Sequence, residues 1–234
     1  MGPLVIRQPA KGYRFSIDSV LLAGFAAPHC RGSVLDLGTG CGVILLLLSR
    51  LAPAMGTGTG VEIQRSLCSF AERNFRENGL SGRLRAVPAD LREEAPGVFR
   101  GTYGLVVANP PFGRAGSGRR NPHPERETAR HDVSCTLPEL CAAAARAMAP
   151  AGRFALILPV GRYPELRDEA RREGMEAVET RRVHARPGDP PSRVLILLAR
   201  GVGNVPRELP PLRLHEGAGK YCPEVERICR LFRS

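Results

Sequence analysis

Short apolar runs rich in β-branched residues alternate with helical stretches from residue 33 onward, and this alternation constrains the fold more than any other feature. Seven runs are predicted to be strands: 33–37, 58–62, 84–87, 103–108, 153–158, 176–183 and 193–200. Helices are expected over 43–51, 65–78, 137–148 and 164–173. This order is typical of a mostly parallel sheet with helices on both faces, so the predicted fold class is α/β and doubly wound.

Several helix ends carry recognisable capping signals. Thr136 and Glu139 have capping-box spacing at the start of the third helix, and Gly79 is placed to end the second. Ser16 or Asp18 is expected to cap a helix over the apolar run 20–27, which precedes the sheet.

A length of 234 residues and 43% hydrophobic residues fit one domain with a sizeable core. The predicted organisation is an N-terminal arm and helix over 1–32, a catalytic domain over 33–201, and a tail over 202–234. The tail is expected to be a proline-rich linker followed by a short basic helix over 223–232. Residues 113–132, rich in Gly, Arg and Pro, are expected to form a long loop.

Composition bears on partners and compartment. The net charge of +11 favours a polyanionic partner such as RNA, while 5% aromatic residues and no Trp argue against an extended base-stacking surface. The seven cysteines lack metal-ligand spacing and are interpreted as buried thiols. Neither an apolar run of membrane-spanning length nor an export signal is present, so a cytoplasmic location is expected. The sequence is compatible with both a monomer and a homodimer.

A glycine-rich turn follows the first predicted strand. Asp36 precedes Gly38 and Gly40, in a turn that lets a ligand approach the backbone at the carboxyl edge of a parallel sheet. Dinucleotide-binding folds use similar turns, but a carboxylate before the first glycine would repel a pyrophosphate. Because a carboxylate can hold an ammonium group, the pattern favours a cofactor that carries an amino acid.

Two further acids follow the next two strands. Glu62 ends the second strand, where a carboxylate can accept both hydroxyls of a ribose. Asp90 follows the third, where it can accept from an adenine amino group while Leu91 supplies a backbone amide. Each acid alone is more simply a solvated loop carboxylate or a helix cap. Three acids at the ends of three successive strands favour a cofactor site.

The fourth strand ends at the turn Asn109-Pro110-Pro111-Phe112. The Asn109 side-chain oxygen and the Pro110 carbonyl are two acceptors in a stretch where prolines remove competing amide donors. Hydrogen bonds from both N–H groups of an aromatic amine would favour a pyramidal nitrogen and direct its lone pair at the methyl group to be transferred. Phe112 is expected to stack on a base that has been extracted from its strand.

Basic residues follow this turn. They form either a loop that contacts RNA phosphates or ordinary solvated charge, and His131 is either a substrate contact or a helix-capping or surface histidine. The candidates for RNA contact are Arg119, Arg120, Arg126, Arg130 and His131.

These motifs together resemble the bacterial adenine-N6 methyltransferases that modify the adenine next to the anticodon of a valine tRNA. Besides the cofactor region, 34–44 and 60–64, the similarity includes 12–22 near the N-terminus, 129–131 after the Asn-Pro-Pro turn and 221–225 in the tail. The resemblance therefore covers nearly the whole chain.

The resemblance implies a class I methyltransferase fold with a seven-stranded sheet, an antiparallel last strand and S-adenosylmethionine bound at the carboxyl edge. It implies a catalytic tetrapeptide of Asn109, Pro110, Pro111 and Phe112. Arg14, Phe15 and Ser16 would close over the methionine end of the cofactor. The implied lining of the cofactor site is Asp36, Gly38, Gly40, Glu62, Ile63, Asp90, Leu91 and Asn109.

Other functions remain open. Phe112 stands where many amino-methylating relatives have Tyr, and Phe also occurs in relatives that methylate guanine N2 in ribosomal RNA. A protein glutamine side chain would fit the same two acceptors. A non-catalytic RNA-binding module would not need Asp36, Glu62 and Asp90 together with Asn109. Metal-dependent methyl transfer is disfavoured, because no acid cluster stands where a divalent ion would be held.

Overall fold

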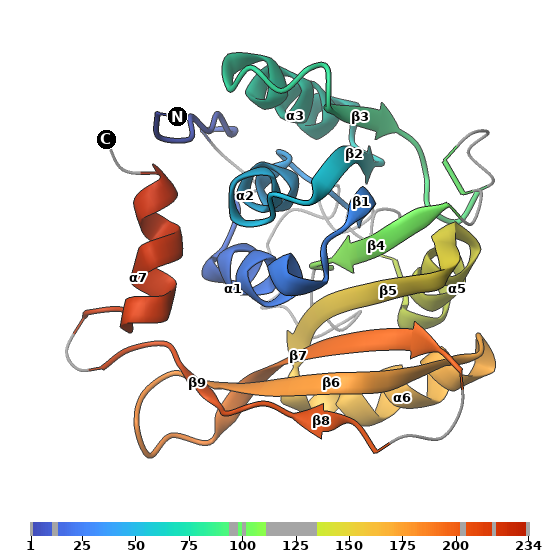
Figure 1. The fold of residues 1–234 in the computed structure, drawn as a ribbon, viewed down its shortest axis with the longest axis vertical. Helices are drawn as coiled ribbons and strands as arrows, with labels where there is room; N and C mark the ends of the chain where they lie inside the picture. Colours follow the sequence, from blue (N-terminus) through green and yellow to red (C-terminus); the bar gives the residue numbers. More distant parts are fainter. Residues whose placement is uncertain are drawn as a thin grey trace, which may run out of the picture.

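The computed structural model describes residues 2–10, 14–93, 98–99, 102–110, 135–201, 205–216 and 219–232. A twisted mixed sheet runs through the molecule with helices on both faces (Figure 1). Its strands lie in the order β3-β2-β1-β4-β5-β7-β6-β8, and β9 also pairs with β6. The strands are β1 Gly32–Leu37, β2 Met55–Glu62, β3 Leu84–Pro88, β4 Tyr103–Ala108, β5 Met148–Pro159, β6 Met175–His184, β7 Pro191–Arg200, β8 Arg207–Glu208 and β9 Leu212–Arg213.

The predicted doubly wound fold is confirmed. Strands β3, β2, β1, β4 and β5 pair in parallel, and β7 lies antiparallel between β5 and β6. The last of the seven predicted strands is thus the antiparallel one. Two antiparallel steps return β6 to the direction of β5, so β6 ends at the same edge of the sheet as β1 to β5.

Helices cover the sheet in two layers. One hydrophobic core packs α1, α2, α3 and α7 against one face, and a second packs α5 and α6 against the other. The helices are α1 Ile17–Ala26, α2 Val43–Leu51, α3 Arg65–Glu77, α5 Leu137–Ala147, α6 Tyr163–Arg172 and α7 Pro223–Cys229, with 3-10 turns at Ala27–His29, Val160–Arg162 and Arg230–Phe232. None of the helices in the described ranges has the length and apolarity needed to cross a membrane.

Two of the three predicted caps are confirmed. Thr136 and Glu139 form a reciprocal capping box. Gly79, at φ +69°, follows α3 in a left-handed turn, in which its own N–H and that of Leu80 donate back to the last turn of the helix. The prediction for α1 was wrong: Ser16 occupies the N-cap position, but its side chain makes no capping hydrogen bond.

The tail is more ordered than the predicted linker. β8 and β9 lie in it and pair in parallel with β6. They cover backbone groups that would otherwise be unpaired at an edge strand. The predicted helix is α7, which packs beside α1 (Figure 1) and continues into a 3-10 turn. It is not basic as predicted, because Glu224 and Glu226 offset Arg227 and Arg230. Such short pairings leave no period-2 hydrophobic signal, so the sequence does not predict them.

Candidate active site

The predicted functional residues lie along one edge of the sheet. Asp36 is the next-to-last residue of β1 and Glu62 the last of β2, and Asp90 and Asn109 follow β3 and β4. The register pairs Asp36 with Gly60, Glu62 with Pro88, and Leu37 with Ala108. Because all four strands are parallel, these side chains are brought to neighbouring positions at their carboxyl ends, as the sequence predicts.

Asp36 lies in the interior with a relative exposure of 0%. Its Oδ2 accepts a hydrogen bond from Thr39 Oγ1 at 2.7 Å, while its Oδ1 is buried and has no hydrogen-bond partner in the described residues. Burial raises the pKa of Asp36 to about 7, opposed by the Thr39 hydrogen bond and reinforced by the nearby charge of Glu62. Thr39 is a residue that sequence reasoning missed, although its place inside the glycine turn was a signal.

Glu62 holds the glycine turn against β2. Its Oε2 accepts from the Gly40 backbone N–H and its Oε1 from that of Gln64, both at 2.9 Å. Burial raises the pKa of Glu62, and these amide hydrogen bonds oppose the rise. Gly38 and Gly40 have φ of +73° and +55°, left-handed values that other residues rarely adopt.

The residues after β3 are more exposed to solvent than Asp36 and Glu62. Asp90 forms a bidentate ion pair with Arg92, and this hydrogen bonding lowers the pKa of Asp90. The Leu91 carbonyl accepts from Arg146 at 2.9 Å. Ile63, next to Glu62, is a large apolar side chain with 37% exposure. An exposed apolar side chain beside two acids is suited to the flat ring of a nucleoside.

Asn109 is oriented by helix α1. Its Nδ2 donates to Ser19 Oγ at 3.0 Å, and Ser19 is only 2% exposed. This bond commits the amide nitrogen to α1 and leaves Oδ1 as the acceptor of the side chain. The half-buried Pro110 follows. Ser19 is a second residue that sequence reasoning missed, although it lies in segment 12–22, which resembles the family.

The residues present fit a cofactor that carries an amino acid and a nucleoside. A buried carboxylate oxygen without a partner calls for a donor, and the ammonium group of an amino acid is one. A turn of glycines at positive φ lets such a ligand lie against backbone.

The other predicted site residues precede α1 or fall outside the described part of the chain. Phe15 packs on Phe232 with ring centroids 5.7 Å apart, Arg14 is exposed, and Ser16 precedes α1. The predictions for Pro111, Phe112, Arg119, Arg120, Arg126, Arg130 and His131 fall outside the described residues.

The glycine turn is also held from α3. Asn74 is fully buried and donates from Nδ2 to the Cys41 carbonyl in the turn at 2.8 Å and to the Arg7 carbonyl at 2.9 Å. Its Oδ1 accepts from the Arg7 N–H at 2.7 Å. Asn78, one helical turn later, makes the same pair of bonds to Val5 but contacts no part of the glycine turn. Two asparagines thus dock the N-terminal arm on α3, and one of them reaches the cofactor loop.

This difference gives a matched pair of variants. Asn74→Ala is expected to weaken cofactor binding by about tenfold and to lower the melting temperature, because it leaves a buried carbonyl of the loop unsatisfied. Asn78→Ala is expected to lower cofactor affinity clearly less than Asn74→Ala, since it loosens the arm without leaving a carbonyl of the glycine turn unsatisfied. Calorimetric titration of both variants checks the prediction, and equal losses of affinity would contradict it.

The described cysteines are free thiols. Five of the seven are buried, and Cys135 and Cys229 are half-buried. Burial raises the pKa of Cys41, beside the site, to about 11. The thiolate of Cys41 is therefore disfavoured at neutral pH, and its burial agrees with the predicted buried thiols.

Comparison with known proteins agrees with this geometry. Residues 16–159 match the family model "Methyltransferase small domain". A tRNA1(Val) (adenine(37)-N6)-methyltransferase of Tolumonas auensis is 30% identical over 94% of this chain and 89% of its own. A relative of the same name from Parabacteroides distasonis is 31% identical over 78% of this chain and 75% of its own.

The fold has solved counterparts as well. A predicted O-methyltransferase from Agrobacterium tumefaciens, Atu636, superposes with a TM-score of 0.69 at 21% identity, covering 92% of this chain and 96% of that one. The resemblance stated from the sequence is confirmed by these matches. The chain belongs to the methyltransferase small-domain family and, among the methyltransferases that use S-adenosylmethionine, to the family of tRNA1(Val) (adenine(37)-N6)-methyltransferases.

Proposed function

We propose that this protein methylates the exocyclic N6 amino group of an adenine in tRNA, the adenine next to the anticodon of a valine tRNA. The observation that carries the proposal is Asn109, held by Ser19 at the end of β4, on the strand next to the one that ends in Asp36. An amide oxygen there is suited to accept from an amine placed beside the methyl donor. The names of the two relatives support adenine and tRNA as the target.

Three acids bind the cofactor in this proposal. When bound, S-adenosylmethionine supplies an electrophilic methyl group on a sulfonium. Asp36 would hold the ammonium with its free Oδ1, and Glu62 would accept from the ribose hydroxyls while it keeps its hydrogen bond from the Gly40 amide. Asp90 accepts from the adenine amino group and the Leu91 amide donates to the ring, while Ile63 packs on its face. The arm and helix over 1–32 bring Arg14, Phe15 and Ser16 over the methionine end.

Asn109 and Pro110 prepare the substrate nitrogen. The lone pair of an adenine N6 is delocalised into the ring, which makes it a poor nucleophile. Asn109 Oδ1 and the Pro110 carbonyl accept its two N–H groups, favour a pyramidal nitrogen and direct the lone pair at the methyl carbon. S-adenosylmethionine, held by Asp36, Glu62 and Asp90, would supply the methyl group to this nitrogen and leave as a neutral thioether. No strong base is needed, because the N-methylated ammonium product is acidic and gives its proton to solvent.

Pro111 and Phe112 complete the tetrapeptide. Pro111 lacks an N–H that could compete for the acceptors, and Phe112 stacks on the extracted base. Arg119, Arg120, Arg126, Arg130 and His131 are proposed to contact RNA phosphates. Since the substrate is tRNA, we place the reaction in the cytoplasm.

Product analysis tests the function. The protein is incubated with labelled S-adenosylmethionine and, separately, total tRNA, ribosomal RNA and a release factor, and the digested products are identified by mass spectrometry. The expected product is N6-methyladenosine in valine tRNA. N2-methylguanosine in ribosomal RNA or methylglutamine in the release factor would replace the proposal with one of the alternatives.

A further inference from the structure

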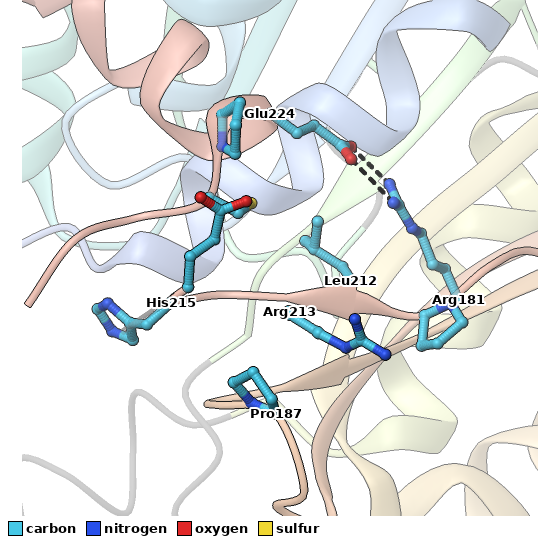
Figure 2. A pocket seen from close by; sticks show the side chains of 10 residues that line it. Arg181, Pro187, Leu212, Arg213, His215 and Glu224 are labelled. Atoms are coloured by element: carbon cyan, nitrogen blue, oxygen red, sulfur yellow. Dashed lines mark hydrogen bonds and ion pairs between the residues drawn. The ribbon is translucent and has the colours of Figure 1, made fainter. Parts of the chain in front are cut away.

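We propose that a pocket between the tail and the end of β6 binds the RNA backbone beyond the methylated nucleotide. Arg213 contacts a phosphate there, and the stacked rings of His215 and Tyr221 lie beside a neighbouring base. This inference rests on the proposed function, because it takes RNA as the substrate. The pocket is about 460 Å³ and is lined mainly by residues of the tail (Figure 2).

The pocket lies on the catalytic edge of the sheet. β9 pairs in parallel with β6, with Arg213 opposite His184, so both strands end at the edge that carries Asn109. Four strand spacings, β4-β5-β7-β6-β9, separate the two positions. At ~4.8 Å per spacing the lateral separation is ~19 Å, and the register places Arg213 about three residues, ~10 Å, further along the strands. The pocket is therefore ~22 Å from Asn109, a distance spanned by a few nucleotides.

The position of the cofactor decides which half of the carboxyl edge is open to RNA. The ends of β1, β2 and β3 carry the acids that bind it in the proposed function. RNA that enters at Asn109 is therefore directed to the other half of the edge, over β5, β7, β6 and β9. Helix α1 connects the halves, because Ser19 binds Asn109 while its neighbour Asp18 binds Arg193 at the start of β7.

Two arginines and two glutamates line the pocket, and one arginine and one glutamate are bound to each other. Glu224 neutralises Arg181 through two contacts of 2.5 and 2.9 Å, drawn in Figure 2. Exposed Glu216 also lines the pocket, and its backbone N–H donates to the carbonyl of Lys220. Arg213 is exposed, and its guanidinium makes no ion pair or hydrogen bond within the described ranges. An unneutralised guanidinium in a pocket is suited to a phosphate.

The rings add the second element. His215 and Tyr221 stack with centroids 5.0 Å apart and an interplanar angle of 21°, and both are half-buried. His215 Nδ1 is buried without a partner in the described residues. Tyr221 begins the tail motif that resembles the family, and Cys222 and Glu224 of the same motif line the pocket. The tail therefore places Arg213, which has no ion pair in the described residues, beside two aromatic rings, a combination suited to single-stranded RNA.

Salt-dependent binding tests the inference. The binding of a fluorescently labelled, unmodified valine tRNA transcript is measured by anisotropy between 50 and 200 mM KCl for wild type, Arg213→Gln and Arg76→Gln. Arg76 is the matched control. It is also exposed, but it lies in the last turn of α3, which packs on β3 at the other end of the strand order. We expect Arg213→Gln to raise Kd about three- to tenfold and to reduce the log–log salt slope by about 0.7 to 1, with Arg76→Gln unchanged.

Methylation kinetics supply an independent readout. The KM for tRNA is expected to rise in Arg213→Gln, with kcat and the Kd for S-adenosylmethionine within about twofold of wild type. Equal behaviour of the two variants, or no tRNA binding by wild type, overturns the inference. Wild type that binds tRNA without forming N6-methyladenosine refutes the proposed function instead, and the anisotropy comparison still decides the pocket.

Discussion

Asn109→Ala is expected to lower the rate of N6 methylation by roughly three orders of magnitude, because it removes the acceptor that orients the substrate amine. The amide is committed to this role by its bond to Ser19, which uses the nitrogen and leaves the oxygen. The Kd for S-adenosylmethionine is expected to stay within several-fold of wild type, since Asp36 and Glu62 remain. Single-turnover methylation of a valine tRNA transcript and calorimetric titration measure the two quantities.

A second variant separates orientation from folding. Ser19→Ala keeps Asn109 but removes the hydroxyl that accepts from its Nδ2, so a smaller loss of rate, roughly tenfold, is expected with unchanged cofactor affinity. Ser19→Thr keeps a hydroxyl and is expected to recover most of that loss. Retained turnover in Asn109→Ala would contradict the role assigned to the side chain.

The second large effect concerns Asp36. Asp36→Asn is expected to weaken S-adenosylmethionine binding by roughly 100-fold or more at pH 8, because it removes the buried charge that pairs with the ammonium. The same substitution is expected to raise the melting temperature of the free protein. Thr39 bonds one carboxylate oxygen of Asp36 and the other has no partner in the described residues, so the free protein holds an imperfectly compensated charge.

The pH dependence follows from the raised pKa. Asp36 has a pKa of about 7 in the folded protein against 3.8 for an unperturbed Asp, so between these values the folded state binds the extra proton. The contribution of Asp36 to stability therefore falls as pH rises through this window and remains unfavourable above it. Cofactor affinity changes in the opposite sense, because only the carboxylate attracts the ammonium.

Calorimetry at pH 6, 7 and 8 measures this effect. Wild-type affinity is expected to fall by up to about tenfold between pH 7 and pH 6, and Asp36→Asn to show no such change. Thermal melts of both proteins without cofactor, at the same three pH values, give the stability difference. Wild-type affinity that is flat from pH 6 to 8 would show that Asp36 is not the titrating partner.

Local patterns predicted most of the fold. The seven strands and the helices between them were found within a few residues of their bounds, since apolar periodicity and capping residues act over short distances. β2 and β5 begin earlier than predicted, at Met55 and Met148, because their first residues pair with neighbouring strands without an apolar pattern of their own. The placement of Asp36 and Glu62 at one edge also followed from sequence, because parallel strands end together.

The sequence by itself therefore determined the order of strands and helices, the family and the residues available for the chemistry. Only the tertiary structure decided which atoms of those residues are free to bind a ligand. Ser19 meets Asn109 across 90 residues, Asn74 meets Arg7 across 67, and the tail folds back to place Glu224 on Arg181. Such contacts depend on how layers pack in three dimensions, and no local pattern records them.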